Sequence, residues 1–420
     1  MRDFFNLPER LKDLDKKVME MCSQQFEKIA ENTFYNQQKV LSAFINHNVS
    51  EAHFTPSTGY GYGDRGRDVL EEVFAECMGA EDSLIRHNFV SGTHTLTVGL
   101  FGLLRPGDTM LSVTGSPYDT LIGVLGIDEK TDGSLADFGV NYDEVPLKND
   151  MPDLDAIREK LSSKKYKMAY IQRSRGYSLR PSLSISDIEK IINVVREVSP
   201  ESIIFVDNCY GEFVEDREPL AVGADVIAGS LIKNPGGGIA PPGGYIAGKH
   251  EYVEQCAYRL TAPGVGREVG CTLGHTRELF MGLFSAPHVV GEALKTAVYT
   301  AALFELLGYE VTPRYDEHRA DIIEAVKLRN EDALIAFCQG MQSGAPIDSF
   351  VVPEPWEMPG YDSKVIMAAG AFTNGASIEL SADAPLREPY AAWMQGGINF
   401  DSGRIGVLMA AKSMMDKGII

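Results

Sequence analysis

Between residue 84 and about residue 250, short apolar runs alternate with longer patterns of helical period. Apolar runs with the length of buried strands lie at 110–113, 168–171, 203–206 and 226–228. Patterns typical of helices lie between them, at 95–104, 154–161 and 185–198. In the last of these helices, Ser186 and Glu189 have the spacing of a capping box. This alternation predicts a mostly parallel central sheet covered by helices, and therefore an α/β fold.

The flanking segments divide the chain into three predicted parts. Residues 1–55 are expected to form an N-terminal helical arm, because helical periodicity extends from residue 7 to about residue 47. This helix either packs on its own domain or reaches a partner subunit. Residues 56–290 form the large α/β domain, and residues 291–420 a smaller α+β domain. The elements predicted in the smaller domain include strands at 365–369 and 376–380 and a closing helix at 406–417.

Composition narrows the class of protein. The chain has 420 residues and a net charge of −20, which argues against nucleic acid or an anionic membrane as partner. It contains no apolar run of the length that spans a membrane, and its N-terminus lacks the pattern of a signal peptide. The six scattered cysteines fit a reducing compartment, so we expect a cytoplasmic protein. The eight histidines show no metal-binding motif, and no metal site is predicted.

Two charged residues follow neighbouring predicted strands. Asp207 ends the run 202–206, and Lys233 lies 26 residues later in the segment Gly229–Pro235. Pyridoxal phosphate (PLP) chemistry needs such a pair, a lysine that forms a Schiff base with the aldehyde and an acid that keeps the pyridine nitrogen protonated. Burial is expected to lower the pKa of Lys233 and favour its neutral amine. The alternatives are a surface lysine and an acid that only caps a turn.

Other residues fit a binding site for a phosphorylated ring. Gly92 allows close approach of the backbone at the start of a predicted helix, where Ser91 and Thr93 either bind an anion or act as plain helix caps. Ser230 offers a hydroxyl three residues before Lys233. Tyr118 follows a strand, where it either stacks on the pyridine ring or packs in the core.

Several arginines are candidates for binding a carboxylate. Arg173 and Arg175 follow a predicted strand, and they either hold a substrate carboxylate or phosphate or belong to an ordinary surface loop. In the C-terminal part, Arg387 and Arg404 are the candidates for a clamp on the substrate α-carboxylate, and ordinary salt bridges are the alternative. The glycine-rich stretch 57–67 is interpreted as a ligand loop or a flexible surface loop.

Four segments together resemble a known family. They are Gln172–Ser178, Val206–Phe213, Gly229–Gly237 and Ser377–Asp383. In these motifs and in its order of elements, the chain is similar to the fold-type-I, aspartate-aminotransferase-like PLP enzymes. Within them it resembles the cysteine/methionine-metabolism group, and in particular the methionine γ-lyase-related or "aluminium resistance" branch. The resemblance covers nearly the whole chain.

The resemblance implies a set of roles. Lys233 would carry PLP as a Schiff base, Asp207 would pair with the pyridine nitrogen, and Tyr118 would stack on the ring. The phosphate would be held by Ser91, Gly92, Thr93 and Ser230, with Tyr210 beside the cofactor. A tyrosine and an arginine from a neighbouring subunit reach the phosphate in the wider group, and the matching candidates are Tyr60, Tyr62 and Arg65. Ile232 stands where a hydroxyl residue usually precedes the lysine.

The expected function is that of a PLP-dependent carbon–sulfur lyase. It would act on a sulfur-containing amino acid, as methionine γ-lyase and cystathionine β-lyase do, and would release a 2-oxo acid, ammonia and a thiol. An aminotransferase or aldolase reaction keeps the same cofactor and is the first alternative. A non-catalytic relative with a part in metal tolerance is the second. The predicted assembly is a homodimer or homotetramer with shared active sites.

Overall fold

The chain divides into two compact units in the computed structural model, which describes residues 3–127, 131–358 and 363–420. One unit comprises Met1–Tyr35 and Ala286–Ile420, and the other comprises Asn36–Ser285. Both boundaries fall inside helices, in α2 (Ser23–Asn46) and in α9 (Thr276–Leu306). The sequence placed residues 1–55 in a separate arm, whereas here the first 35 residues group with the C-terminal segment.

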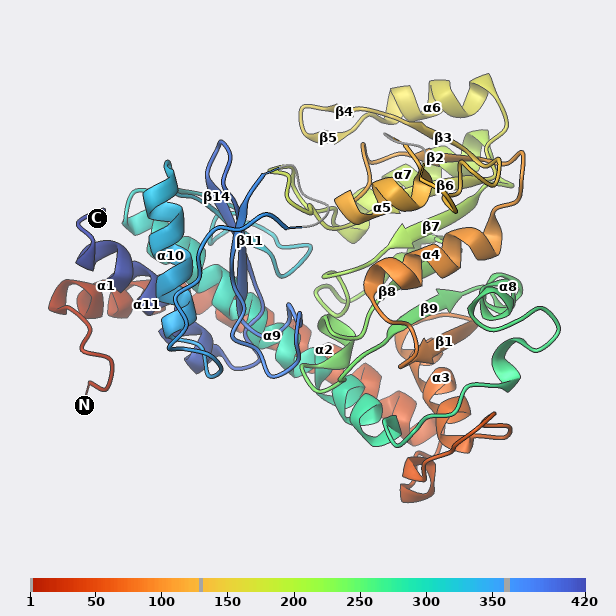
Figure 1. Ribbon diagram of the computed structural model, residues 1–420, viewed down its shortest axis with the longest axis horizontal. Coiled ribbons are helices and arrows are strands. Elements are labelled where there is room, and N and C mark those ends of the chain that lie inside the picture. The colour runs from red at the N-terminus through yellow and green to blue at the C-terminus, as the bar shows by residue number, and fades with distance from the viewer. Residues whose placement is uncertain (1–2, 128–130, 359–362) are drawn as a thin grey trace. The chain divides into compact units, whose positions relative to one another are not determined.

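The larger unit is built on a mixed sheet with the strand order β1-β9-β8-β7-β6-β2-β3. Its strands are β1 (Asp82–Arg86), β2 (Thr109–Ser112), β3 (Asn141–Glu144), β6 (Met168–Gln172), β7 (Ile203–Asp207), β8 (Val226–Ser230) and β9 (Gly244–Gly248). In Figure 1 the labels of this sheet follow the same order. A short hairpin joins β4 (Leu147–Lys148) to β5 (Met151–Pro152). The predicted α/β class with a mostly parallel sheet is confirmed.

The directions of the strands decide where the site lies. β3, β2, β6, β7 and β8 pair parallel to one another, while β9 pairs antiparallel with both β8 and β1. β1 therefore points the same way as β8, and among the described strands of this sheet only β9 is reversed. The carboxyl ends of all the others meet at one edge, where α/β sheets bind their ligands.

Helices connect and cover these strands. They are α3 (Arg65–Met78), α4 (Gly92–Leu103), α5 (Asp119–Leu125), α6 (Leu154–Ser163), α7 (Ile185–Val198) and α8 (His250–Leu260), with short 3-10 turns at Glu51–Phe54, Pro219–Val222, Asn234–Gly236 and Gly266–Glu268. The capping box of α7 is formed by Ser184 and Asp187. The predicted pair, Ser186 and Glu189, is wrong by two residues, because Ile185 already belongs to the helix and is buried.

The smaller unit has an antiparallel sheet with the order β10-β11-β14-β13-β12. Its strands are β10 (Glu310–Thr312), β11 (Glu324–Lys327), β12 (Val365–Ala368), β13 (Ser381–Pro385) and β14 (Ala391–Gln395). They share a core with α1 (Glu9–Met21), α10 (Glu331–Ser343), α11 (Phe400–Asp416) and the second half of α9. None of the helices among the described residues is both long and apolar enough to cross a membrane.

Two predicted elements of this unit differ in the structure. The segment 376–380, predicted as a strand, is largely buried but forms a turn. Its Ile378 carbonyl accepts a hydrogen bond from Gly397 N (2.9 Å). β12 pairs instead with β13, which begins directly after this segment, at Ser381. The helix predicted from residue 7 to about 47 is divided at Cys22, which is buried against the backbone of Val298.

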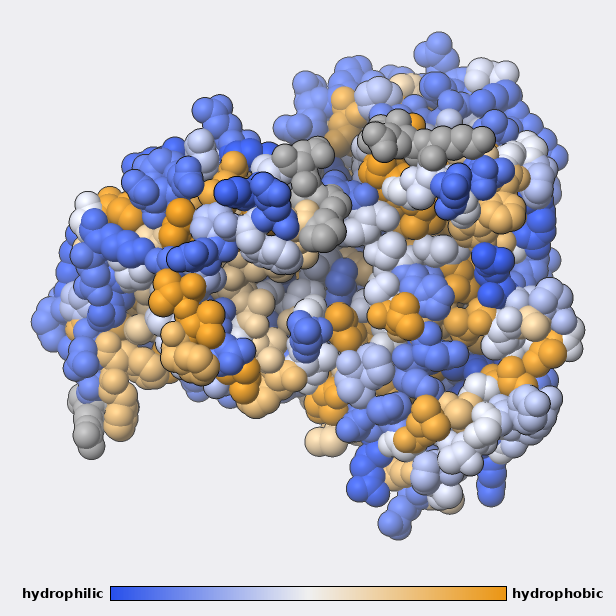
Figure 2. All heavy atoms as spheres, viewed as in Figure 1, coloured by the Kyte–Doolittle hydropathy of each residue, from blue (hydrophilic) through white to orange (hydrophobic). Residues whose placement is uncertain are grey.

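Hydrophilic and hydrophobic side chains both occur on the surface. Figure 2 shows hydrophilic residues over much of the visible face, with smaller hydrophobic patches between them. The core of the larger unit lies under α4, where Gly99 faces β7. A Cβ added to Gly99 would lie 2.7 Å from Cε2 of Phe205, so the helix approaches the sheet closely only because this residue has no side chain.

We expect Gly99→Ala to lower the thermal midpoint of the protein. Overpacking costs about 1–3 kcal/mol, and the better helix propensity of alanine offsets up to ~1 kcal/mol of it. Gly123→Ala in α5 is the matched control, because an added Cβ there meets no atom within 4 Å. It should raise the midpoint. Thermal unfolding followed by circular dichroism measures both, and a Gly99→Ala protein as stable as Gly123→Ala would contradict the close packing.

Candidate active site

Lys233 and Asp207 come from adjacent parallel strands. Asp207 is the last residue of β7, and its register partners are Gln172 on β6 and Ala228 on β8. Lys233 lies three residues beyond the end of β8, and its Nζ is 4.0 Å from the centroid of the Tyr210 ring. Both charged residues therefore lie at the carboxyl edge of the sheet, on the side that the sequence analysis predicted.

Asp207 is held by its own loop and by the strand beside it. Its Oδ1 accepts a hydrogen bond from Cys209 N (3.1 Å), and its Oδ2 lies 3.5 Å from the hydroxyl of the buried Tyr170. Burial raises the pKa of Asp207, and the charge of Lys233 opposes this. An acid in this position can pair with a cationic ring nitrogen, whose charge would take the place of bulk solvation.

The pKa of Lys233 is shifted in the direction opposite to the expectation. Burial on its own would lower the pKa of Lys233, but Cys209, Tyr210, Asp207 and Glu212 together raise it above its ordinary value. The expectation of a depressed pKa is therefore wrong for this arrangement, because it counted desolvation and left out the neighbouring acids. Since only the neutral amine attacks an aldehyde, these neighbours govern how readily Lys233 reacts.

A helix N-terminus faces the end of β8. The Ser91 hydroxyl caps α4 by accepting a hydrogen bond from His94 N (3.0 Å), and the Thr93 hydroxyl is 2.7 Å from that of Thr120. A Cβ on Gly92 would be 3.3 Å from Cβ of the buried Ser230. The first turn of α4 and the Ser230 hydroxyl thus lie side by side, in an arrangement that suits an anionic phosphate.

Tyr118 immediately precedes α5 and is half-buried. Its ring centroid is 6.1 Å from that of Tyr177, and a Cβ on Gly176 would be 3.3 Å from its Cδ2. Tyr118 therefore lies against the segment 172–178, which follows β6, at the same edge of the sheet as Asp207.

Arg173 is fully buried beneath the loop that follows Asp207. Its Nη1 donates to Asn208 Oδ1 (2.8 Å) and its Nη2 to Glu215 Oε2 (2.8 Å). A Cβ on Gly211 would be 2.5 Å from the guanidinium carbon, so this loop crosses directly over the arginine. These contacts favour a structural role for Arg173 over the predicted contact with substrate. Arg175 is also buried, and its backbone N–H donates to the Ser182 hydroxyl (3.1 Å).

Some residues at the site were missed by the sequence analysis. The buried Asn234 donates from Nδ2 to the carbonyls of Tyr210 (2.9 Å) and Glu212 (3.0 Å), which ties the lysine loop to the loop after β7. Tyr245 of β9 donates to the buried Glu212 carboxyl (2.7 Å). The signal that could have found Asn234 is its position beside Lys233, but its bonding partners are more than 20 residues away along the chain.

The glycine-rich stretch 57–67 is a braced loop with exposed tyrosines. The relative exposures of Tyr60 and Tyr62 are 75% and 67%, and their ring centroids are 5.6 Å apart. The buried Arg67 donates to the carbonyls of Gly61 (2.8 Å) and Gly270 (3.2 Å). Arg65 is exposed as well. The loop is therefore fixed from within while its tyrosines and Arg65 face outward.

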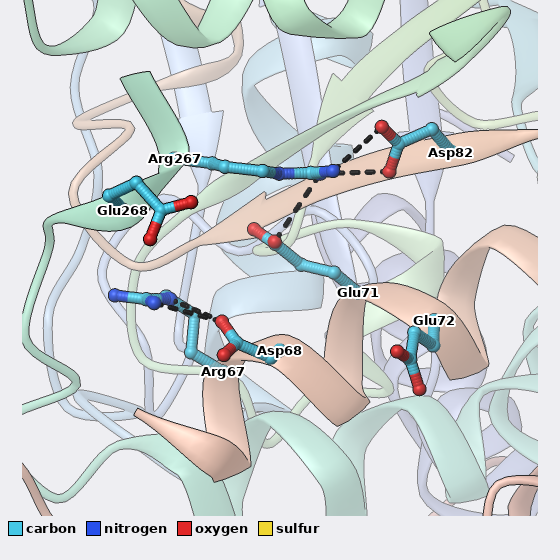
Figure 3. Close-up of a pocket in the computed structure, with 7 residues that line it drawn as sticks. All are labelled: Arg67, Asp68, Glu71, Glu72, Asp82, Arg267 and Glu268. Atoms are coloured by element: carbon cyan, nitrogen blue, oxygen red, sulfur yellow. Dashed lines mark hydrogen bonds and ion pairs between the residues drawn. The ribbon is translucent and has the colours of Figure 1, made fainter. Parts of the chain in front are cut away.

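A charged pocket of about 240 Å³ lies next to this loop (Figure 3). Its lining residues are Arg67, Asp68, Glu71, Glu72, Asp82, Arg267 and Glu268. Arg267 pairs with both oxygens of Asp82 (2.7 and 2.8 Å), and Arg67 with Asp68 (2.8 Å). Both arginines of the pocket are thus paired with acids, which makes these pairs a brace between α3, β1 and the segment around Arg267.

The two C-terminal arginines belong to the smaller unit and differ in their bonding. Arg387 lies in the exposed turn after β13. Arg404 of α11 donates to both oxygens of Asp15 (2.7 and 2.5 Å), and Tyr299 also donates to Asp15 (2.7 Å). For Arg404 the structure thus shows an ordinary salt bridge, which was the alternative to a clamp on the substrate carboxylate.

Comparison with known proteins gives a consistent result. The chain matches the family described as methionine gamma-lyase over residues 11–415. It is 49% identical over 398 residues to the uncharacterized protein YnbB of Bacillus subtilis, covering 94% of each chain. It is 52% identical to a structure described as a carbon–sulfur lyase involved in aluminum resistance, from Clostridium novyi NT. That match has a TM-score of 0.94 and covers 98% of this chain and 97% of the other.

A more distant likeness concerns the fold alone. The PLP-dependent protein YhfS from Escherichia coli has a TM-score of 0.64 at 16% identity, covering 92% of this chain and 97% of that one. Together with the family match, this likeness agrees with the α/β fold described above. The chain belongs to the methionine gamma-lyase family and is a PLP-dependent lyase of fold type I.

Proposed function

We propose that the protein cleaves a carbon–sulfur bond of a sulfur-containing amino acid by β- or γ-elimination and releases a 2-oxo acid, ammonia and a thiol. The observation that carries the proposal is that Lys233, just beyond β8, lies at the same edge of the sheet as the buried Asp207 and the N-terminus of α4. The family match and the carbon–sulfur lyase from Clostridium novyi NT support the class of reaction.

The residues at this edge fit PLP. Gly92 leaves room beside Ser230, the first turn of α4 offers backbone N–H groups, and Asp207 is a buried acid. PLP attached to Lys233 would supply an electron sink for the charge that develops at the substrate α-carbon. In this proposal Ser91, Gly92, Thr93 and Ser230 hold the phosphate, and Tyr118 and Tyr210 flank the ring.

Proton transfer is assigned to Lys233. With its amine free, Lys233 would be the base that takes the substrate α-proton. Asp207 keeps its negative charge toward the ring nitrogen throughout. Since the acids around Lys233 raise its pKa, the ammonium formed on taking the proton is stabilised.

Arg387 is proposed as the residue that binds the substrate carboxylate. Its side chain is exposed, and no ion pair of its guanidinium occurs among the described residues. Arg404 already uses two donors on Asp15.

We further propose a homodimer or homotetramer in which Tyr60, Tyr62 and Arg65 reach the phosphate of a neighbouring subunit. The support is a loop braced by Arg67 that presents two tyrosines to the outside. A neighbouring subunit that covered this pair of adjacent rings would remove their apolar surface from water, which is favourable.

Lys233→Ala should reduce release of 2-oxo acid and thiol from L-methionine, L-cystathionine and L-cysteine by at least about 10³-fold, because the variant loses both the attachment and the base. Lys249→Ala is the matched control, since Lys249 directly follows β9 and pairs with Asp225 (2.8 Å) away from the site. It should keep its activity. A PLP-loaded wild type that releases neither product would contradict the lyase assignment and favour transamination or aldol cleavage.

Arg387→Gln should raise KM about 10- to 100-fold with a smaller change in kcat, because a charged hydrogen bond is worth about 1.5–3 kcal/mol. Arg404→Gln should instead lower the thermal midpoint, since it leaves Asp15 and Tyr299 without the guanidinium. Steady-state kinetics and thermal unfolding of both variants decide between the two arginines. A rise in KM confined to Arg404→Gln would reverse the assignment.

Sites shared between subunits predict complementation. Tyr60→Ala/Tyr62→Ala and Lys233→Ala should each be nearly inactive alone. Mixed subunits should regain up to about a quarter of the activity, because some sites then combine an intact loop with an intact lysine. Activity of the mixture after denaturation and refolding is the measurement, with self-refolded variants as controls. A mixture no more active than its components would speak against sites shared through this loop.

A further inference from the structure

A second acid is buried against the strand that leads to Lys233. Glu212 has no exposed surface, and its Oε1 accepts a hydrogen bond from the hydroxyl of the equally buried Tyr245 (2.7 Å). A Cβ on Gly229 of β8 would lie 2.7 Å from that oxygen and 2.8 Å from the tyrosine hydroxyl. The pair thus packs directly against the strand that leads to Lys233.

The backbone of Glu212 is tied to the lysine loop. Asn234, the residue after Lys233, donates to the carbonyls of both Glu212 and Tyr210. The second carboxyl oxygen of Glu212, Oε2, is buried and has no hydrogen-bond partner among the described residues. Since a buried polar atom without a partner is costly, its retention calls for an explanation.

The mutual influence of the Glu212 and Lys233 charges offers that explanation. The pKa of Glu212 is raised to about 8, chiefly by burial and also by Glu218, while the hydrogen bond from Tyr245 and the positive charge of Lys233 act to lower it. In return, Glu212 is one of the groups that raise the pKa of Lys233, together with Cys209, Tyr210 and Asp207. Burial raises the pKa of the Cys209 thiol well above its usual range, so that side chain stays neutral. Of the other three groups, Asp207 and Glu212 are carboxylic acids, and Tyr210 is a phenol whose ring centroid lies 4.0 Å from Lys233 Nζ.

We propose that Glu212 is a positioning residue that supplies the second buried counter-charge for the Lys233 ammonium, with Tyr245 holding its carboxyl in place. The inference rests on the proposed function only in taking Lys233 as the reactive amine. Asp207 is committed to the cofactor ring in that proposal. Glu212 is then the acid left to balance Lys233 when it carries a proton, and its effect grows as the Glu212 carboxyl ionises.

The test measures how fast the amine of Lys233 is acetylated in the full-length protein without cofactor. A limiting dose of acetic anhydride acetylates neutral amines, and mass spectrometry reports the rate at Lys233 against pH. Glu212→Gln should lower the pKa of Lys233 by about one unit, the lower end of the effect of a nearby opposite charge. At pH 9 the rate would then rise about tenfold, because tenfold more of the amine is neutral. Glu212→Asp, which keeps the charge, should stay close to wild type.

Two further variants make the result interpretable. Glu254→Gln is the matched control, because Glu254 accepts a hydrogen bond from Tyr258 (2.9 Å) in an exposed glutamate–tyrosine pair. It should leave the rate at Lys233 unchanged. Should Glu212→Gln not fold, the double variant Glu212→Met/Tyr245→Phe removes both partners of the hydrogen bond and fills their volume, a change that is often nearly neutral for stability.

The outcomes separate the two claims. A faster reaction of Lys233 in Glu212→Gln or in the double variant, with wild-type rates in Glu212→Asp and Glu254→Gln, supports the inference even if no 2-oxo acid is released from any sulfur amino acid. An unchanged rate profile in folded Glu212→Gln or in the folded double variant overturns it, whatever the enzyme turns over.

Discussion

The loop from Asp207 to Phe213 has to turn beside Lys233 while its polar groups stay buried, and the rest of the site depends on how this is done. Tyr210 and Phe213 both adopt positive φ angles (73° and 61°), a conformation that is unfavourable for large side chains. Arg173 supports the loop from below through Asn208, and Asn234 holds it from the lysine side. The position of Asp207 relative to Lys233 follows from these two supports.

Part of the fold and of the site could be predicted from the sequence. Strand order along the chain was readable from apolar runs, and strand ends from the charged residues that follow them. These two observations were enough to predict Asp207 and Lys233 at the ends of neighbouring strands. In the smaller unit the segment 376–380 alternates apolar and polar residues as a strand does, but its hydrogen bond with Gly397 belongs to a turn. Pairing of that kind is decided by distant residues.

Long-range contacts also decided the roles of the arginines. Arg173, Arg387 and Arg404 are equivalent in the sequence, since each follows or begins a regular element near glycine, serine or proline. In the structure Arg173 is buried against Glu215, Arg404 binds Asp15, and Arg387 is exposed. The pKa of Lys233 is a similar case. Its direction depends on Cys209, Tyr210, Asp207 and Glu212, and from the sequence only Asp207 had been recognised as the acid that accompanies Lys233.

The reversed direction of β9 has a consequence for the space at the edge of the sheet. β9 separates β1 from β8, so these two strands lie two strand spacings apart, about 10 Å. It enters the sheet at that edge through Gly243 and Gly244, and a Cβ on Gly244 would be 2.0 Å from Oγ1 of Thr95 in α4. Between the strand that leads to α4 and the strand that leads to Lys233, the edge therefore consists of bare backbone. The reversed direction of β9 and the absence of side chains at Gly243 and Gly244 thus set the width available to an anion at this edge.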